Sequence, residues 1–347
     1  MAGSSTGGPE YEGLPSAPSD NQRDAEFAFL SRICSRYYLE DRTQSEIAAE
    51  FGLSRQKVQR LIGQARNQGI VEIHVHAAPT LHIELERQLK AAFRLDSVLI
   101  AGSHPDEQVC RRLVARSAAD YLERRLASGA VVAVGLGRNT SAVASAFTPR
   151  RPLGGHFVSA MGGSPAFGEG INPNEVCSTF AMRSGSRADT LYAPAFVEEA
   201  ALREPLLRQP AVAETLDLAR RATAAVIGIG TSTEASILVQ ANCISPQQAR
   251  ELCQRGAVGE MLGNFYDIRG RLVHSHLDNQ FIGLRLRELR RIPLVVAVAG
   301  ERDKLEGIAG ALRTRAINVL VTSSHIALSL LDLASLPDLD VQTSPIG

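Results

Sequence analysis

The chain has 347 residues, of which 44% are hydrophobic, so it is long enough for two domains and can bury a sizeable core. Its formal net charge is zero, which excludes a protein that coats nucleic acid over its whole surface and confines any DNA contact to a local patch. The five cysteines are scattered without a CxxC pair, which argues against a disulfide framework and a zinc site, and we expect neither a metal nor a cofactor.

Residues 1–22 are rich in Gly, Ser and Pro and contain no apolar run of the kind found in signal peptides. This composition predicts a disordered tail. No stretch of the chain approaches about 18 uninterrupted apolar residues, which argues against a membrane span. With no export signal, we expect the protein in the cytoplasm.

Residues 23–77 carry the pattern of a winged helix-turn-helix. A first helix is predicted from about Asp24, because apolar residues recur there at three-and-four spacing. Thr43-Gln-Ser-Glu46 is a capping-box pattern that opens a second helix, which stops at Gly52. Ser54 can cap a third helix ending near Gly69, and the alternating residues 70–76 predict a short strand. This order of elements is typical of DNA-binding heads.

The outer face of the third predicted helix is basic, and no Asp or Glu occurs between Leu53 and Val71. Arginine can fork onto guanine, glutamine onto adenine and lysine onto phosphate, so this face suits a major groove. The candidate DNA-contacting residues are Thr43, Gln44, Ser54, Arg55, Gln56, Lys57, Gln59 and Arg60. The alternatives are the solvated face of an ordinary three-helix bundle, or a module that binds another protein.

Residues 78–95 are predicted to contain a linker helix, since Leu81–Leu95 is amphipathic. This helix could pair two protomers or pack on the following domain. Residues 96–347 form the predicted effector and oligomerisation domain, in which short apolar runs alternate with helical stretches. The runs are residues 97–101, 131–134, 157–161, 190–193, 225–229, 294–299 and 317–322. They predict an α/β fold with a mostly parallel sheet, whose ligands bind at the carboxyl ends of the strands.

Four loops at these strand ends have small, hydroxyl or cationic residues that suit a phosphate and sugar hydroxyls. The candidate ligand-binding residues are Gly135, Gly137, Arg138, Asn139, Thr140, Ser141, Gly162, Gly163, Gly230, Thr231, Ser232, Glu260 and Lys304. An NAD site is disfavoured, because Thr140 occupies the third glycine position of the dinucleotide fingerprint and no acidic residue ends the strand over 157–161.

The sequence contains few signs of a catalytic site, because it has no GxSxG nucleophile elbow, no HExxH motif and no Walker loop. Glu260 and Asp278 could act as general bases or only accept hydroxyl hydrogen bonds. Lys304 could form a Schiff base with an aldehyde or only bind an anion. We therefore assign no catalytic residue, and an enzyme remains the alternative to a sensor.

The chain resembles the SorC-type (SorC/DeoR) sugar-responsive transcriptional regulators of bacteria over nearly its whole length after the tail. The resemblance rests on Tyr37-Tyr-Leu-Glu40, Thr43-Gln-Ser-Glu-Ile-Ala48, Leu53-Ser-Arg-Gln-Lys-Val58, Gly69-Ile-Val-Glu-Ile73, Val134-Gly-Leu-Gly-Arg138, Met161-Gly-Gly163, Gly228-Ile-Gly-Thr231, Gly256-Ala-Val-Gly-Glu260, Phe265-Tyr-Asp267, Gly270 and Ile317-Asn-Val-Leu-Val-Thr322. Departures from the family pattern are Leu136 and Asn139 in the first loop, Glu260-Met261 in place of Asp-Ile, and Ser323 and Ser324 where an acidic residue is common.

The resemblance implies a body similar in fold to glucosamine-6-phosphate deaminase and ribose-5-phosphate isomerase. It implies a phosphorylated sugar or polyol as effector, with the phosphate on the loops of residues 135–141 and 230–232 and the sugar oriented by Glu260 and Lys304. It also implies double-stranded operator DNA and a homo-oligomer, a dimer or a tetramer, as partners. We therefore expect a regulator, more often a repressor of a carbohydrate or polyol operon, and as the alternative a sugar-phosphate isomerase or deaminase-like enzyme with an added helical domain.

Overall fold

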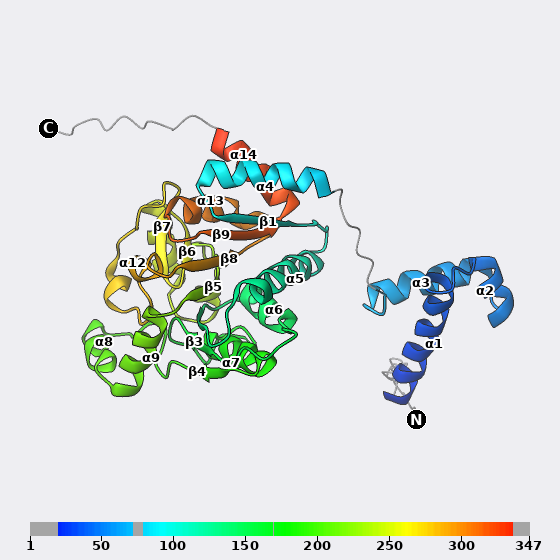
Figure 1. The fold of residues 1–347 in the computed structure, drawn as a ribbon, viewed down its shortest axis with the longest axis horizontal. Helices are drawn as coiled ribbons and strands as arrows, with labels where there is room; N and C mark the ends of the chain where they lie inside the picture. The colour runs from blue at the N-terminus through cyan, green and yellow to red at the C-terminus, as the bar shows by residue number, and fades with distance from the viewer. Residues whose placement is uncertain (1–19, 72–78, 169, 336–347) are drawn as a thin grey trace, which may run out of the picture. The chain divides into compact units, whose positions relative to one another are not determined.

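The computed structural model describes residues 20–71, 79–168 and 170–335 (Figure 1). The chain divides into two compact units, Met1–Val75 and His76–Gly347. In the part of the chain that the structure describes, no helix is both long enough and apolar enough to cross a membrane.

The first unit is a bundle of three helices, α1 (Asp20–Tyr38), α2 (Gln44–Phe51) and α3 (Arg55–Asn67). Helix α3 packs against both α1 and α2. The core between them is formed by Ile33, Ile47, Val58 and Ile62, each no more than 3% exposed. Because burying a large aliphatic side chain is worth about 1.5–3 kcal/mol, these four residues hold the small bundle together.

The turn between α2 and α3 follows the sequence prediction. The Thr43 amide donates to Glu46 Oε2 at 2.8 Å, and the Glu46 amide donates to Thr43 Oγ1 at 3.3 Å, so the capping box is complete. Gly52 ends α2 in the left-handed region at a φ of 64°, and Ser54 caps α3 by accepting from the Lys57 amide. These local bonds set the angle at which α3 leaves α2.

Two features of the first unit differ from the sequence prediction or lie beyond it. Helix α1 begins at Asp20 rather than near Asp24, because residues 20–23 are polar and carry no apolar repeat that would reveal the extra turn. The expected strand over residues 70–76 lies outside the described residues after Val71, and Ile70 and Val71 pack against the end of the bundle.

The second unit is built on a sheet of seven parallel strands in the order β1-β9-β8-β5-β2-β3-β4, with a separate antiparallel pair β6-β7. The strands are β1 (Ser97–Ala101), β2 (Val131–Val134), β3 (His156–Ser159), β4 (Arg187–Asp189), β5 (Ala224–Gly228), β6 (Ala257–Met261), β7 (Asn264–Asp267), β8 (Leu294–Val298) and β9 (Val319–Ser323). The predicted parallel α/β fold is confirmed.

Helices cover both faces of this sheet (Figure 1). The α-helices are α4 (Pro79–Phe93), α5 (Glu107–Arg125), α6 (Arg138–Ala146), α7 (Pro173–Ser184), α8 (Ala200–Leu207), α9 (Pro210–Arg220), α10 (Ile237–Gln240), α11 (Pro246–Gln254), α12 (Leu286–Leu289), α13 (Leu305–Arg313) and α14 (Ser324–Ser335), with short 3₁₀ turns at His276–Asn279 and Arg302–Lys304. Helices α5, α6 and α7 cover the face that receives Val132 and Val134, and α4, α9, α13 and α14 cover the face that receives Ala133.

Helix α4, the predicted linker helix, packs on the second unit. It lies against α14 and β1, and Leu85, Leu89 and Phe93 are buried in the main core. The sequence left two roles open for this helix, and these contacts show that it packs on the following domain.

Two strand assignments were wrong or missing. The apolar run at residues 190–193 is not a strand. The edge strand there is β4 at Arg187–Asp189, because the following residues turn to contact the loop after β3. The hairpin β6-β7 was not predicted, since its residues do not form a continuous apolar run.

Candidate functional site

The sheet has a topological switch point between β2 and β5. The chain leaves β2 toward β3 on one side, and leaves β5 toward β8 on the other side. The loops that follow these two neighbouring strands therefore separate and leave a crevice at the carboxyl edge. In open α/β sheets this crevice is where ligands bind.

A cleft of about 90 Å³ lies at this point. It is lined by Leu136, Gly137, Arg138, Asn139, Gly228, Ile229, Gly230, Thr231, Ala235, Ser236, Ile237, Glu260, Leu262, Asp303 and Lys304. The predicted residues that it brings together are Gly137, Arg138, Asn139, Gly230, Thr231, Glu260 and Lys304.

One wall of the cleft is the N-terminus of α6. Gly137 precedes the helix at a φ of 120°, a conformation that suits glycine, and no side-chain cap hydrogen bond is made at the first turn by the residues that the structure describes. The Arg138 guanidinium stands exposed at this end and donates to Gln240 Oε1 at 3.3 Å. Lys304 reaches the same cleft from the loop after β8. Uncapped amides, a helix dipole and two cations make this wall suited to an anion.

The opposite wall carries Glu260, which β6 brings onto the loop after β5. Gly230 and Glu260 exchange both backbone hydrogen bonds at 3.0 Å, and a Cβ on Gly230 would lie 2.1 Å from Glu260 Oε1. Burial raises the pKa of Glu260 to about 7, although the Gly263 amide and the Lys304 charge act in the opposite direction. A carboxyl group with this pKa can either accept or donate a hydrogen bond to a hydroxyl near neutral pH.

Glu301, which we did not single out from the sequence, is the ionic centre of this edge. It accepts from Asn139 Nδ2 at 3.0 Å and pairs with Lys304 at 3.3 Å and Arg111 at 3.2 Å. Burial alone would raise its pKa, but the Lys304 charge, followed by the hydrogen bonds from Asn139 and the Gly300 amide, lowers it to about 2. An acidic residue one glycine after the predicted strand over residues 294–299 was the signal that could have identified it.

Several predicted ligand-binding residues point elsewhere. The hydroxyl of buried Thr140 donates to the Gly137 carbonyl at 2.8 Å, and that of buried Ser232 donates to the Ala257 carbonyl at 2.7 Å. Both hydroxyls thus satisfy backbone carbonyls, that of Thr140 in its own loop and that of Ser232 at the start of β6, while Ser141 and Gly135 lie outside the cleft lining.

The glycine pair Gly162-Gly163 also lies outside the cleft lining. A Cβ on Gly162 would lie 2.3 Å from the Pro194 carbonyl oxygen, and one on Gly163 would meet the Asn172 side chain at 2.8 Å. These glycines let two loops pack backbone to backbone. Asp278, a candidate base, accepts from His274 on the surface instead.

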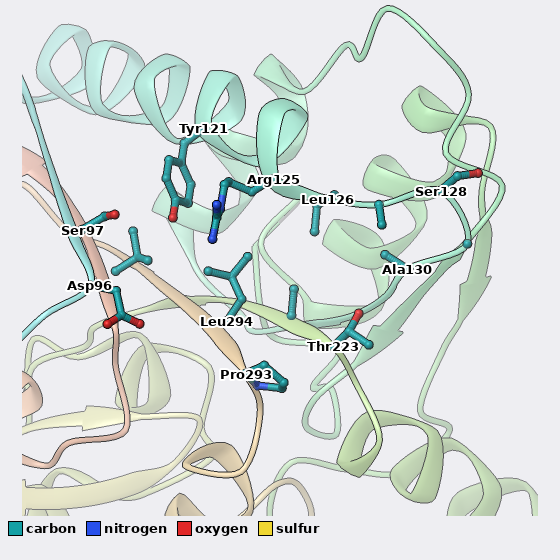
Figure 2. A pocket seen from close by; sticks show the side chains of 14 residues that line it. Asp96, Ser97, Tyr121, Arg125, Leu126, Ser128, Ala130, Thr223, Pro293 and Leu294 are labelled. Carbon is teal, nitrogen blue, oxygen red and sulfur yellow. The ribbon is translucent and has the colours of Figure 1, made fainter.

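A larger hollow of about 710 Å³ lies at the opposite edge of the sheet, where the strands begin. Figure 2 shows Tyr121 and Arg125 projecting into it from α5, above Asp96 and Leu294. It contains none of the predicted ligand-binding residues. The uncapped helix and the cations instead converge at the switch point, where open α/β sheets bind ligands.

The predicted DNA-contacting residues lie together on the first unit. Arg55, Gln56, Lys57, Gln59 and Arg60 are all exposed on α3. Thr43, Gln44 and Arg55 line one shallow hollow at the start of α2. Among the described residues, the Arg55, Lys57 and Arg60 side chains take part in none of the ion pairs of this unit, which join Arg36 to Glu40 and Glu50.

No group of three or more His, Cys, Asp or Glu side chains that could hold a metal occurs within residues 20–71, 79–168 and 170–335. The polar groups of the cleft are backbone amides, the cations Arg138 and Lys304, and the carboxyl groups of Glu260 and Asp303. It can hold a small anion and orient hydroxyl groups next to it.

Comparisons with known proteins agree with this arrangement. The family model described as "Putative sugar-binding domain" matches residues 78–332, and a "Helix-turn-helix domain" model matches residues 32–74. The erythritol catabolism regulatory protein EryD of Brucella abortus is 29% identical over 311 residues, which cover 89% of this chain and 98% of EryD. The transcriptional regulator LsrR of Escherichia coli is 31% identical over 309 residues, which cover 87% of this chain and 94% of LsrR.

Solved structures show the same similarity. The sugar-binding domain of a transcriptional repressor from Vibrio fischeri is 37% identical with a TM-score of 0.68, covering 73% of this chain and 99% of that one. The full-length sorbitol operon regulator SorC from Klebsiella pneumoniae is 25% identical with a TM-score of 0.70, covering 90% of this chain and 100% of SorC. With its helix-turn-helix head and its sugar-binding body, the chain belongs to the SorC-type family of bacterial transcriptional regulators.

Proposed function

We propose that this regulator binds operator DNA through α3 and that a phosphorylated sugar or polyol in the switch-point cleft controls its operator affinity. The observation that carries the proposal is the uncapped N-terminus of α6 with Arg138 and Lys304 beside it, facing the buried Glu260. The amides and cations bind the phosphate, and the carboxyl group of Glu260 binds a sugar hydroxyl.

The size of the cleft gives this binding a consequence. At about 90 Å³ the cleft is smaller than the roughly 300 Å³ at which ordinary ligand pockets begin. A phosphosugar that fills the cleft must therefore move its walls apart, and Arg138, which lines the cleft, also contacts Gln240. Ligand binding and a change of conformation are thereby coupled.

Repression relieved by the effector is the direction that we propose, and it is supported by the similar body of the Vibrio fischeri repressor. We divide the chain into a DNA-binding head over residues 23–77, a linker helix over residues 78–95, and an effector and oligomerisation domain over residues 96–347. Two heads of a dimer would read a pseudo-palindromic site, and a tetramer would read two such sites.

Fluorescence anisotropy of the purified protein on its own upstream DNA tests the proposal. The ligand panel contains phosphates of sugars and polyols, including those of erythritol and sorbitol because of the names of EryD and SorC. Arg55→Ala and Arg60→Ala should each weaken sequence-specific binding by roughly 1–3 kcal/mol, whereas Arg116→Ala on the exposed face of α5 should not.

Arg138→Gln should keep operator binding and lose the response to the effector. If the α3 variants bind DNA as the control does, the assignment of α3 is wrong. If no phosphorylated compound shifts binding and one is turned over in a Glu260-dependent manner, the enzyme alternative replaces the proposal.

A further inference from the structure

A second cavity, of about 330 Å³, lies at the carboxyl edge next to the switch-point cleft. It opens where β1, β9 and β8 end, between the start of α5 and the start of α14. Its lining is His104, Pro105, Glu107, Cys110, Arg111, Asn139, Gly300, Glu301, Arg302 and His325. Asn139 is the residue that lines both cavities.

The imidazole of His325 is the unexplained group in this cavity. Both of its ring nitrogens are shielded from bulk water, and neither has a hydrogen-bond partner among the described residues. Burial, followed by the nearby Arg302 charge, lowers the pKa of His325, so the ring is neutral and offers one donor and one acceptor. A buried polar group without a partner is rare in proteins, and a water molecule or an ion is a usual partner at such a group.

The charges around His325 favour an anion. Arg111 and Arg302 face the cavity against Glu107 and Glu301. The Glu301 carboxylate, however, is already neutralised by Lys304 from the other side, in addition to Arg111. Glu107 and Arg302 are both exposed, and the three cations Arg111, Arg302 and Lys304 carry one charge more than the two carboxylates of Glu107 and Glu301.

We propose that this cavity is a second anion site, which takes a phosphate group between Arg302, Arg111 and His325. Its guanidinium groups supply charge-assisted hydrogen bonds, and His325 supplies a neutral donor. The volume admits either inorganic phosphate or a small organic phosphate monoester, whose phosphate chemistry is the same. The inference does not depend on DNA binding or on the identity of the effector.

Titration calorimetry of the full chain with inorganic phosphate at constant ionic strength tests the site. We expect two phosphates per chain. Arg302→Gln and His325→Gln should both weaken the binding of the same phosphate by about tenfold or more and leave the affinity for the other phosphate unchanged. Arg138→Gln should weaken the other phosphate instead, and Arg124→Gln, which changes an exposed arginine at the far end of α5, should change neither.

The proposal is overturned if Arg302→Gln titrates like Arg124→Gln, or if Arg138→Gln removes all binding. Arg302 is exposed, so its variant should fold even if the His325 variant does not. A repeat of the titration with glycerol 3-phosphate distinguishes free phosphate from an organic monoester as the natural ligand. If glycerol 3-phosphate binds the Arg302-dependent site more tightly than inorganic phosphate does, the site is assigned to organic monoesters. If it binds more weakly, the site is assigned to free phosphate. Loss of the Arg302-dependent phosphate alone overturns this inference and leaves the proposed function intact, whereas loss of the Arg138-dependent phosphate alone counts against the proposed effector cleft and leaves this inference intact.

Discussion

Two buried glutamates at one edge of the sheet have opposite electrostatic environments. Glu301 faces two cations and an amide, which hold its pKa at about 2 despite burial. Glu260 has the Gly263 amide and the more distant Lys304 charge, so burial dominates and raises its pKa to about 7. The first carboxylate therefore organises the cations, while the second is free to exchange a proton near neutral pH.

The raised pKa of Glu260 predicts a loss of stability with rising pH. Its pKa is about 4.5 in the unfolded chain and about 7 in the folded one, so its contribution is fully present below pH 4.5 and is lost as the pH rises through 7. Glu260→Gln should abolish this loss. The free energy of unfolding, measured with urea, should be compared for the variant and the wild type at pH 5 and pH 8. The value for the variant minus that for the wild type should increase by roughly 2–3 kcal/mol over this range. The exposed Glu234→Gln is the matched control, and an equal slope in both variants would refute the assignment.

The turn of the head depends on one backbone conformation, which a pair of glycine substitutions can isolate. Gly52 has a φ of 64° with open space around it, so Gly52→Ala adds only backbone strain and should destabilise α2–α3 by roughly 1–2 kcal/mol. Gly63 lies inside α3, also in open space, and Gly63→Ala should stabilise the same region by about 1 kcal/mol. Amide hydrogen exchange over residues 44–67 in the full chain measures both, and shifts of the same sign would contradict this account.

Local patterns predicted the elements whose causes are local. The capping box at Thr43 and the buried run of β2 both lie in the structure where the sequence places them. The edge strand β4 and the hairpin β6-β7 escaped prediction, because pairing with distant segments creates them. Of the glycine-rich loops predicted to bind a ligand, two contribute residues to the cleft, yet Thr140 and Ser232 in those loops turn their hydroxyls to the backbone. Glycine and hydroxyl composition alone cannot distinguish a ligand contact from a loop that satisfies itself.

The proposed function requires a property that neither unit can have alone, which is a coupling between effector binding in the cleft and DNA binding by the head. If the effector changes operator affinity by a given factor, operator DNA must change effector affinity by the same factor, because both describe one thermodynamic cycle. We expect a factor of about 5–150, the usual range of such couplings. Anisotropy with and without effector gives one ratio, calorimetry with and without operator gives the other, and unequal ratios would mean that the effector acts through a different site or assembly.

A substitution in the cleft should remove this coupling and spare DNA binding. In Gly230→Ala the new Cβ would lie 2.1 Å from Glu260 Oε1, so the carboxyl group must leave its place and the cleft loses its hydroxyl-binding wall. Effector should then no longer change operator affinity, and operator DNA should no longer change effector affinity, so both ratios fall to about one. Operator affinity without effector should stay within about twofold of wild type, a difference below roughly 0.5 kcal/mol. Gly168→Ala, whose Cβ meets Ile171 at an ordinary 3.5 Å, is the control and should keep both ratios. If Gly230→Ala instead weakens operator binding in the absence of effector, the cleft stabilises the DNA-binding form itself, and the effector strengthens a conformation that the protein already adopts.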